Sequence, residues 1–228
     1  MTGYLPDMTY SRIRLFPPNN PAPRLASLPL ENTRRWISTY EDDGNSAPVS
    51  VFLTQKTFQQ IMEHASSDLE KEVGGILVGK WCLDSETPRQ YIVVTASLPA
   101  RFTQHGSVFL TFTQDSLVDI RAKIDEEYPE DVIVGWYHTH PRMGVFLSQY
   151  DTWLHEHFFP ELWQVALVIE PHSEVGGFFV RQAGGVLDPD RYFGFYELYD
   201  IARPSIVHWN NLQQGMAEGK NKGVDHNE

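Results

Sequence analysis

The sequence predicts an α+β domain in which a mixed sheet and helices pack as layers. Short apolar runs typical of buried strands recur along the middle of the chain, and other segments carry apolar residues at helical spacing. The two kinds of segment do not alternate strictly, which argues against a doubly wound parallel fold. The chain has 228 residues, 41% hydrophobic and 13% aromatic, which is enough apolar material for one core with residues left over for tails.

Apolar runs bounded by turn residues predict the strands. The expected strands are Val73–Val78, Tyr91–Ala96, Val108–Phe112, Asp131–His138, Val165–Glu170, Gly177–Arg181 and Tyr192–Leu198. Two earlier runs, 34–40 and 49–53, could also be strands, and 41–48 would be the turn between them.

Helical spacing of apolar residues predicts three helices. The first is capped by Thr54 and runs to about Leu69; the second begins near Thr113 and ends before Pro129. The third covers Ser148–Phe159. Its expected apolar face consists of Tyr150, Trp153, Leu154 and Phe158.

Three regions follow from this organisation. Residues 1–48 contain a proline-rich arm, Pro17–Leu30, and the extra strands if these form. Residues 49–200 form the main domain, and residues 201–228 form a polar C-terminal tail. The aromatic run Phe193–Tyr199 is expected to be strand packing, with a partner or homodimer contact as the alternative.

Charge and cysteine content narrow the classes of function. The net charge of −12 disfavours nucleic acid as a partner. Cys82 is the only cysteine, so it can form neither an intrachain disulfide nor a cysteine metal cluster. Residues 1–16 lack the apolar stretch of a signal peptide, and no run is long enough to span a membrane. We therefore expect a cytoplasmic protein without a membrane partner.

The most informative stretch of the sequence runs from Gly135 to Asp151. His138 and His140 end a predicted strand, where positions two apart share one face, so both imidazoles can reach one metal ion. Asp151 follows Ser148 by three residues near a helix start and could point back as the third ligand. Three protein ligands with one open position are typical of catalytic zinc.

A zinc hydrolase also needs a base that is not a ligand. Glu72 is the candidate, because it lies directly before an apolar strand whose paired glycines allow another element to approach closely. The Ser148 hydroxyl could stabilise the oxyanion that forms when water attacks a carbonyl. Each of these signals is weak alone, since His-x-His occurs by chance and Ser-x-x-Asp also resembles a capping box.

Taken together, Glu72, the HTHP run 138–141 and the SQYD run 148–151 resemble the JAMM motif of the MPN-plus (JAB) metalloproteases. The resemblance covers roughly 51–180. It implies a curved, mostly antiparallel sheet flanked by helices, in a layered architecture like that of cytidine deaminases. It also implies one Zn²⁺ held by His138, His140 and Asp151, with Glu72 and Ser148 as catalytic residues. The activity implied is removal or processing of a ubiquitin-like (β-grasp) protein modifier by hydrolysis of an amide or isopeptide bond.

The same analogy places substrate contacts at Trp136, Phe102, Met143 and Phe146. His155 lies one turn after Asp151 and is either a rival ligand or a residue beside the site. Only thirteen residues without cysteine separate Asp151 from Val165, so the second zinc site of some deubiquitinating members is not expected.

Three other functions compete with the peptidase. A non-catalytic MPN scaffold usually lacks the metal ligands, which this chain retains. A zinc deaminase would need a Glu two residues after the first ligand and a pair of cysteines. A hydrolase of small amides stays open, because the motif specifies the reaction and not the leaving group.

Overall fold

The computed structural model describes residues 22–41, 47–100, 114–199 and 204–215. Within them lie three helices, namely α1 (Gln55–Ala65), α2 (Gln114–Glu127) and α3 (Gln149–Phe158). The strands are β1 (Arg24–Ala26), β2 (Thr33–Ser38), β3 (Val49–Thr54), β4 (Gly74–Asp84), β5 (Gln90–Pro99), β6 (Val132–Thr139), β7 (Val165–Glu170), β8 (Val175–Phe179), β9 (Phe195–Leu198) and β10 (Leu212–Gln214).

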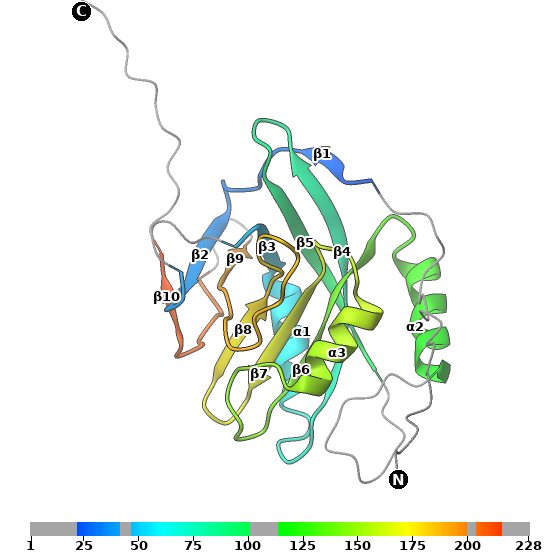
Figure 1. Cartoon of the computed structure of the whole chain (residues 1–228), viewed down its shortest axis with the longest axis vertical. Helices are drawn as coiled ribbons and strands as arrows, with labels where there is room; N and C mark the ends of the chain where they lie inside the picture. Colours follow the sequence, from blue (N-terminus) through cyan, green and yellow to red (C-terminus); the bar gives the residue numbers. More distant parts are fainter. Residues whose placement is uncertain (1–21, 42–46, 101–113, 200–203, 216–228) are drawn as a thin grey trace, which may run out of the picture.

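One curved sheet organises these elements (Figure 1). Its strand order is β10-β2-β9-β3-β5-β4-β6-β7-β8, and β1 pairs with β4 beside that path. Five of the pairings in the described part of the chain are antiparallel and four are parallel. The α+β class with a sheet flanked by helices is therefore confirmed, and the sheet is mixed with antiparallel pairs in the majority.

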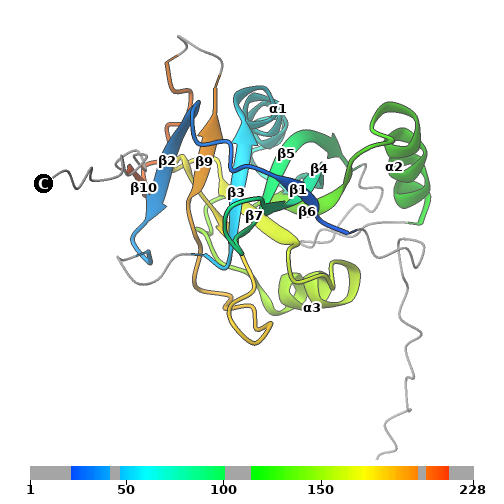
Figure 2. The same ribbon diagram turned by 90° about the horizontal axis from the view of Figure 1, so that it is seen from above.

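Helices cover both faces of the sheet, with α1 on one face and α3 on the other (Figure 2). Successive side chains of β4 point to opposite faces of the sheet, so β4 packs against both helices. Leu77 packs in the cluster that contains Phe58 and Ile61 of α1, whereas Ile76 packs in the cluster that contains Leu154 of α3. Each fully buried large apolar side chain contributes about 1.5–3 kcal/mol, so these two layers hold the strands that carry the site.

The first and third helices differ from their expected form. Thr54 caps α1 as predicted, but the helix ends at Ala65, and Leu69 is 40% exposed. Asp68 accepts hydrogen bonds from two following amides, which stabilise a turn there in place of a further helical turn. On α3 the expected apolar face is only partly buried: Trp153 is 42% exposed, and His155 takes the buried position.

The two early runs 34–40 and 49–53 both contain strands, β2 and β3, but these strands are not neighbours in the sheet. Strand β2 pairs with β9 and β10, and β3 pairs with β5 and β9. Strand β9 lies between them, and its aromatic residues are buried: Phe195 is 2% and Tyr196 5% exposed. This burial bears out strand packing for the run Phe193–Tyr199. The predicted strand Val108–Phe112 lies outside the described residues.

The C-terminal region contributes to the fold as far as residue 215. Trp209 is 2% exposed and packs on Phe58 of α1, with ring centroids 5.2 Å apart. Residues 204–215, which the sequence assigns to a polar tail, thus lie against the domain and supply the edge strand β10.

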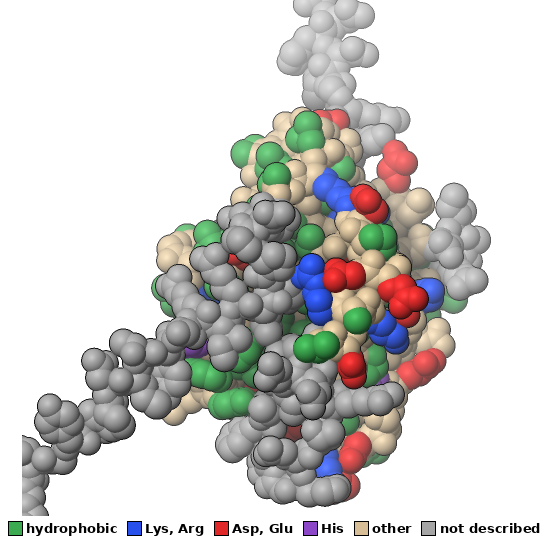
Figure 3. Space-filling view, turned by 90° about the vertical axis from the view of Figure 1, so that its right-hand side faces the viewer, with side chains coloured by type: hydrophobic (Ala, Val, Ile, Leu, Met, Phe, Trp, Pro, Cys, Tyr) green, Lys and Arg blue, Asp and Glu red, His purple; other side chains and the backbone are tan. Residues whose placement is uncertain are grey.

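The surface over α2 is charged. Asp125, Glu126 and Glu127 are exposed, as expected for a solvated helix face, and Arg121 pairs with Asp125 at 3.0 Å. Acidic and basic side chains intermingle on the face shown in Figure 3.

None of the described helices combines the length and the apolar character needed to cross a membrane.

Candidate metal centre

Strand β6 delivers the two histidines to one face of the sheet. His138 lies opposite Gly74 of β4, which has no side chain to block the imidazole. The backbone N–H of His140 donates to the Ile169 carbonyl at 2.8 Å, which continues the pairing with β7 just beyond the end of β6. Pro141 then ends the pairing, as predicted, because proline has no N–H to donate.

Helix α3 delivers the aspartate through a capping box. The Asp151 N–H donates to Ser148 Oγ at 3.1 Å, and the Ser148 N–H donates to Asp151 Oδ2 at 2.8 Å. This reciprocal pair fixes both the start of the helix and the orientation of the carboxylate. Ser148 and Asp151 therefore form the capping box that the sequence left as an alternative, and the carboxylate still faces the histidines.

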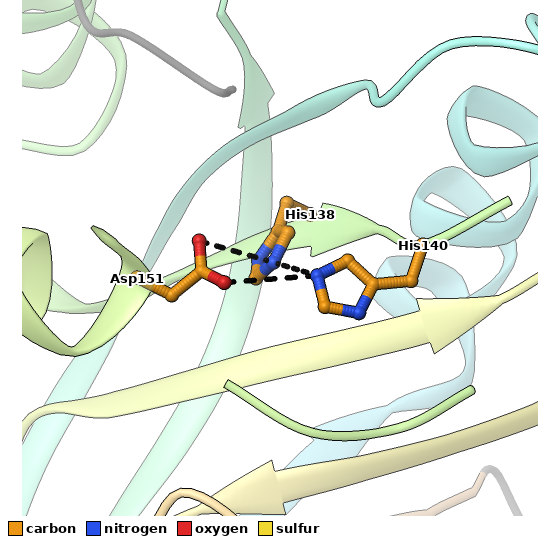
Figure 4. Close-up of side chains that lie close together, drawn as sticks. All are labelled: His138, His140 and Asp151. Carbon is orange, nitrogen blue, oxygen red and sulfur yellow. Dashed lines mark hydrogen bonds and ion pairs between the residues drawn. The ribbon is translucent and has the colours of Figure 1, made fainter. Parts of the chain in front are cut away.

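The three side chains converge on one point (Figure 4). The Nε2 atoms of His138 and His140 are 2.8 Å apart, and Asp151 oxygens lie 3.4 Å from His138 Nε2 and 3.7 Å from His140 Nε2. The exposed fractions are 0%, 2% and 4% for His138, His140 and Asp151. The ligand atoms lie within 4.8 Å of one another, so a single ion can contact all three.

The electrostatics suit a metal cation. Burial lowers the pKa of His138, which keeps the imidazole neutral and its nitrogen available as a ligand. Burial alone would raise the pKa of Asp151, but hydrogen bonds from His138 and His140 outweigh it and hold that pKa well below its usual range. Two imidazoles and one carboxylate form a donor set that fits a divalent metal with a coordination position left for another molecule.

Trp136 and His155 form a layer behind the first histidine. The Trp136 indole stacks on His138 with ring centroids 4.7 Å apart and an interplanar angle of 8°, and its Nε1–H donates to His155 Nδ1 at 3.1 Å. Both side chains are fully buried. The structure thus places Trp136 in the core, away from a substrate-accessible wall, and His155 outside the cluster of ligand atoms.

Glu72 lies two residues before β4, in a segment that hydrogen bonds hold against the end of β6. The Thr139 N–H donates to the Val73 carbonyl at 2.8 Å, and the Val73 N–H donates to Thr139 Oγ1 at 2.9 Å. The ladder of β4 and β6 ends at Gly74 opposite His138, and extending its register by two residues would pair half-buried Glu72 with His140. Opposed residues of antiparallel strands point to the same side, so we expect Glu72 on the face that carries both histidines.

The predicted substrate contacts are dispersed. Phe146 is half-buried and packs on His140 with ring centroids 4.8 Å apart, so it borders the centre. Met143 is 42% exposed on the same loop. Phe102 lies outside the described residues.

Sequence reasoning missed two residues beside the centre, Arg142 and Glu170. Arg142 has a left-handed backbone with φ of 60°, and its N–H donates to Glu170 Oε1 at 3.1 Å. Glu170 is 2% exposed at the end of β7. The sequence does carry a signal for Glu170, which is a carboxylate at the end of an apolar strand and directly before Pro171. A buried carboxylate at such a position needs hydrogen-bond donors nearby.

Comparison with known proteins places the chain in a family. Residues 46–160 match the family model described as JAB1/Mov34/MPN/PAD-1 ubiquitin protease. The chain is 34% identical over 126 residues to the "NAD(+) hydrolase TcpA" of Theionarchaea archaeon (strain DG-70-1), an overlap covering 54% of this chain and 35% of that protein. It is 26% identical over 152 residues to the "26S proteasome regulatory subunit RPN11" of Encephalitozoon cuniculi, covering 64% of this chain and 50% of that protein.

The chain spans about a third to a half of the length of these curated relatives. A solution structure of protein DSY2949 from Desulfitobacterium hafniense overlaps 66% of this chain and 92% of its own, with 20% identity and a TM-score of 0.46. The family model covers β6 with His138, the residue His140 just beyond it, and α3 with Asp151. The chain belongs to the JAB1/Mov34/MPN/PAD-1 ubiquitin protease family.

Proposed function

We propose that this protein is a zinc-dependent peptidase that hydrolyses an amide or isopeptide bond and removes or processes a ubiquitin-like protein modifier. The observation that carries the proposal is the convergence of the His138, His140 and Asp151 ligand atoms within 4.8 Å. Glu72 lies two residues before β4 and adds a carboxylate from outside the strand that carries His138.

Zinc, Glu72 and Ser148 each have a separate role in the proposed hydrolysis. When bound, zinc would polarise the scissile carbonyl and make a water acidic enough to attack near neutral pH. Glu72 accepts a proton from the attacking water and returns it to the leaving amine as the C–N bond breaks, which yields a carboxylic acid and a free amine. The Ser148 hydroxyl donates a hydrogen bond to the developing oxyanion, a contact typically worth about 3 kcal/mol.

The relatives support a ubiquitin-related substrate without identifying it. The family description names ubiquitin protease activity, and one relative is a regulatory subunit of the 26S proteasome. The name of the other relative gives NAD(+) hydrolysis, but the match covers 35% of that protein, so the name does not assign this activity to the matched segment. The competing functions are a non-catalytic scaffold and a hydrolase of small amides.

Metal content and hydrolysis together test the proposal. We expect about one zinc per chain in the purified protein and none in the His138→Ala/His140→Ala variant. The matched control is His157→Ala, which changes an exposed histidine on α3, the helix that carries Asp151. Binding of zinc by the double variant as well as by the control would refute the site.

Activity is measured on ubiquitin-like proteins that carry a fluorogenic amide or an isopeptide-linked lysine at the C-terminus, with small acyl amides and NAD(+) alongside. The wild-type protein should cleave the protein-linked amides, and Glu72→Gln should retain zinc but lose at least about 100-fold in rate. Cleavage of small amides alone would favour the small-amide hydrolase. Zinc binding without any cleavage would favour the scaffold.

A further inference from the structure

The segment that carries Glu72 has no regular secondary structure of its own. Residues 66–73 connect α1 to β4 and form neither helix nor strand. Within the segment, Asp68 Oδ1 accepts hydrogen bonds from the amides of Glu70 and Lys71 at 3.0 Å each. A general base must be held within about 0.5 Å of its working position, so such a segment needs anchors outside itself.

Glu170 holds two neighbouring turns through one buried carboxylate. Its oxygens accept the backbone N–H groups of Arg142 at 3.1 Å, His172 at 2.8 Å and Ser173 at 2.9 Å. Burial would raise the pKa of Glu170, but these hydrogen bonds outweigh it and keep the pKa below its usual range. The carboxylate is therefore ionised at neutral pH and fixes the turn after the HTHP run to the turn after β7.

Two of the three residues that Glu170 holds by their amides, Arg142 and His172, extend their side chains to the Glu72 segment. Arg142 makes two parallel hydrogen bonds to Glu70, with NH1 to Oε2 and NH2 to Oε1 each at 3.1 Å. His172 Nε2 contacts the Leu69 carbonyl at 2.8 Å. These two contacts meet the chain two and three residues before Glu72, and the Val73–Thr139 pair holds it one residue after.

We propose that Glu170 is a positioning residue for Glu72, acting through two clasps, Arg142–Glu70 and His172–Leu69, that press residues 69–73 against strand β6. The left-handed backbone of Arg142 is part of the Arg142–Glu70 clasp, because it turns the guanidinium back toward Glu70. This inference rests on the proposed role of Glu72 in hydrolysis. It adds residues that touch neither metal nor substrate and act only through the placement of the base.

The clasps are tested by substituting their exposed side chains, because such substitutions leave the core intact. Arg142→Ala/His172→Ala removes both side-chain contacts, and both residues are exposed. The matched control is Arg24→Ala, which removes an exposed ion pair with Glu130 on another part of the fold (3.6 Å). The second variant, Glu170→Gln, removes the charge of the buried carboxylate that holds the backbone of Arg142 and His172.

Hydrogen exchange and kinetics give independent readouts. In the double variant, amides 69–73 should exchange at least about tenfold faster while those of β4 and β6 stay protected. Zinc content and KM should stay unchanged while kcat falls by about 10–100-fold. In a Glu72→Gln background the same double change should produce no further loss in kcat, because the residue to be positioned has already lost its function.

The outcomes separate this inference from the proposed function. Unchanged exchange at 69–73 in the double variant, or equal acceleration in the Arg24→Ala control, would overturn the clasps whatever the enzyme does. Loss of kcat with parallel loss of zinc would also overturn them, since the effect would then lie at the metal ligands. If Glu72→Gln remained active, the assigned role of Glu72 would fail, while the exchange result would still decide whether the clasps hold its segment.

Discussion

Acidification should destabilise this protein through one buried histidine. Burial, aided by the nearby charge of Arg181, lowers the pKa of His155 from 6.5 to about 3. In the unfolded chain the imidazole binds a proton below about pH 6.5, whereas in the folded protein it stays neutral until about pH 3. The unfolded state therefore binds more protons throughout this window, and stability falls as the pH falls from about 6.5 toward 3.

The size of the effect follows from the two pKa values. Each pH unit within the window costs at most about 1.4 kcal/mol for one proton, so lowering the pH from 7 to 5 removes about 2 kcal/mol through His155 alone. His155→Asn is the informative variant. Its amide oxygen stands in place of Nδ1 and can accept the Trp136 N–H, but the side chain does not titrate.

The assay is urea unfolding followed by tryptophan fluorescence, at pH 7 and pH 5, in the presence of a chelator so that loss of metal does not contribute. His155→Asn leaves a small cavity that lowers stability at both pH values, so the comparison uses the change between them. We expect the wild type to lose about 2 kcal/mol more than the variant between pH 7 and pH 5. Equal losses in both proteins would refute the reasoning, because they would show that His155 is not held neutral by burial.

Three further predictions concern the sheet and the metal ligands. Gly75→Ala should destabilise the fold by about 1–3 kcal/mol in urea unfolding, because a Cβ there would lie 2.3 Å from the Leu98 carbonyl oxygen and 2.9 Å from the Tyr137 ring. An unchanged midpoint would mean that these strands can move apart. Asp151→Asn should keep the cap with Ser148, since an amide oxygen still accepts the N–H, but should weaken zinc binding by at least about 10-fold in chelator competition. Unchanged affinity would remove this residue from the ligand set. Zinc at 100 times its dissociation constant should raise stability by about 2.7 kcal/mol in the wild type and leave His138→Ala/His140→Ala unaffected; equal stabilisation would place the metal elsewhere.

The local parts of the site could be predicted because short-range geometry creates them. Two histidines two apart on a strand share a face whatever the strand pairs with. A Ser-x-x-Asp sequence at a helix start closes its capping box with its own backbone. For the same reason the sequence predicts Thr54 as the cap of α1, and the structure confirms it.

Parts of the site that join distant segments could not be predicted in the same way. The stacking of Trp136 on His138 follows from one strand, but the acceptor for its indole comes from α3, nineteen residues later. The hydrogen bonds of Glu170 reach across to Arg142, and the position of Glu72 depends on the register between β4 and β6. Side-chain type indicates that a buried carboxylate or indole needs a partner, but the partner is decided by packing.

By itself, the sequence determined the fold class, the three helices of the described residues and the candidate ligands His138, His140 and Asp151, because periodicity and caps are properties of neighbouring residues. Only the tertiary structure decided that β9 separates β2 from β3, that residues 204–215 join the sheet, and that Trp136 is core. Strand pairing and burial depend on how all segments of the chain pack against one another. They therefore cannot be read from the residues of any one segment.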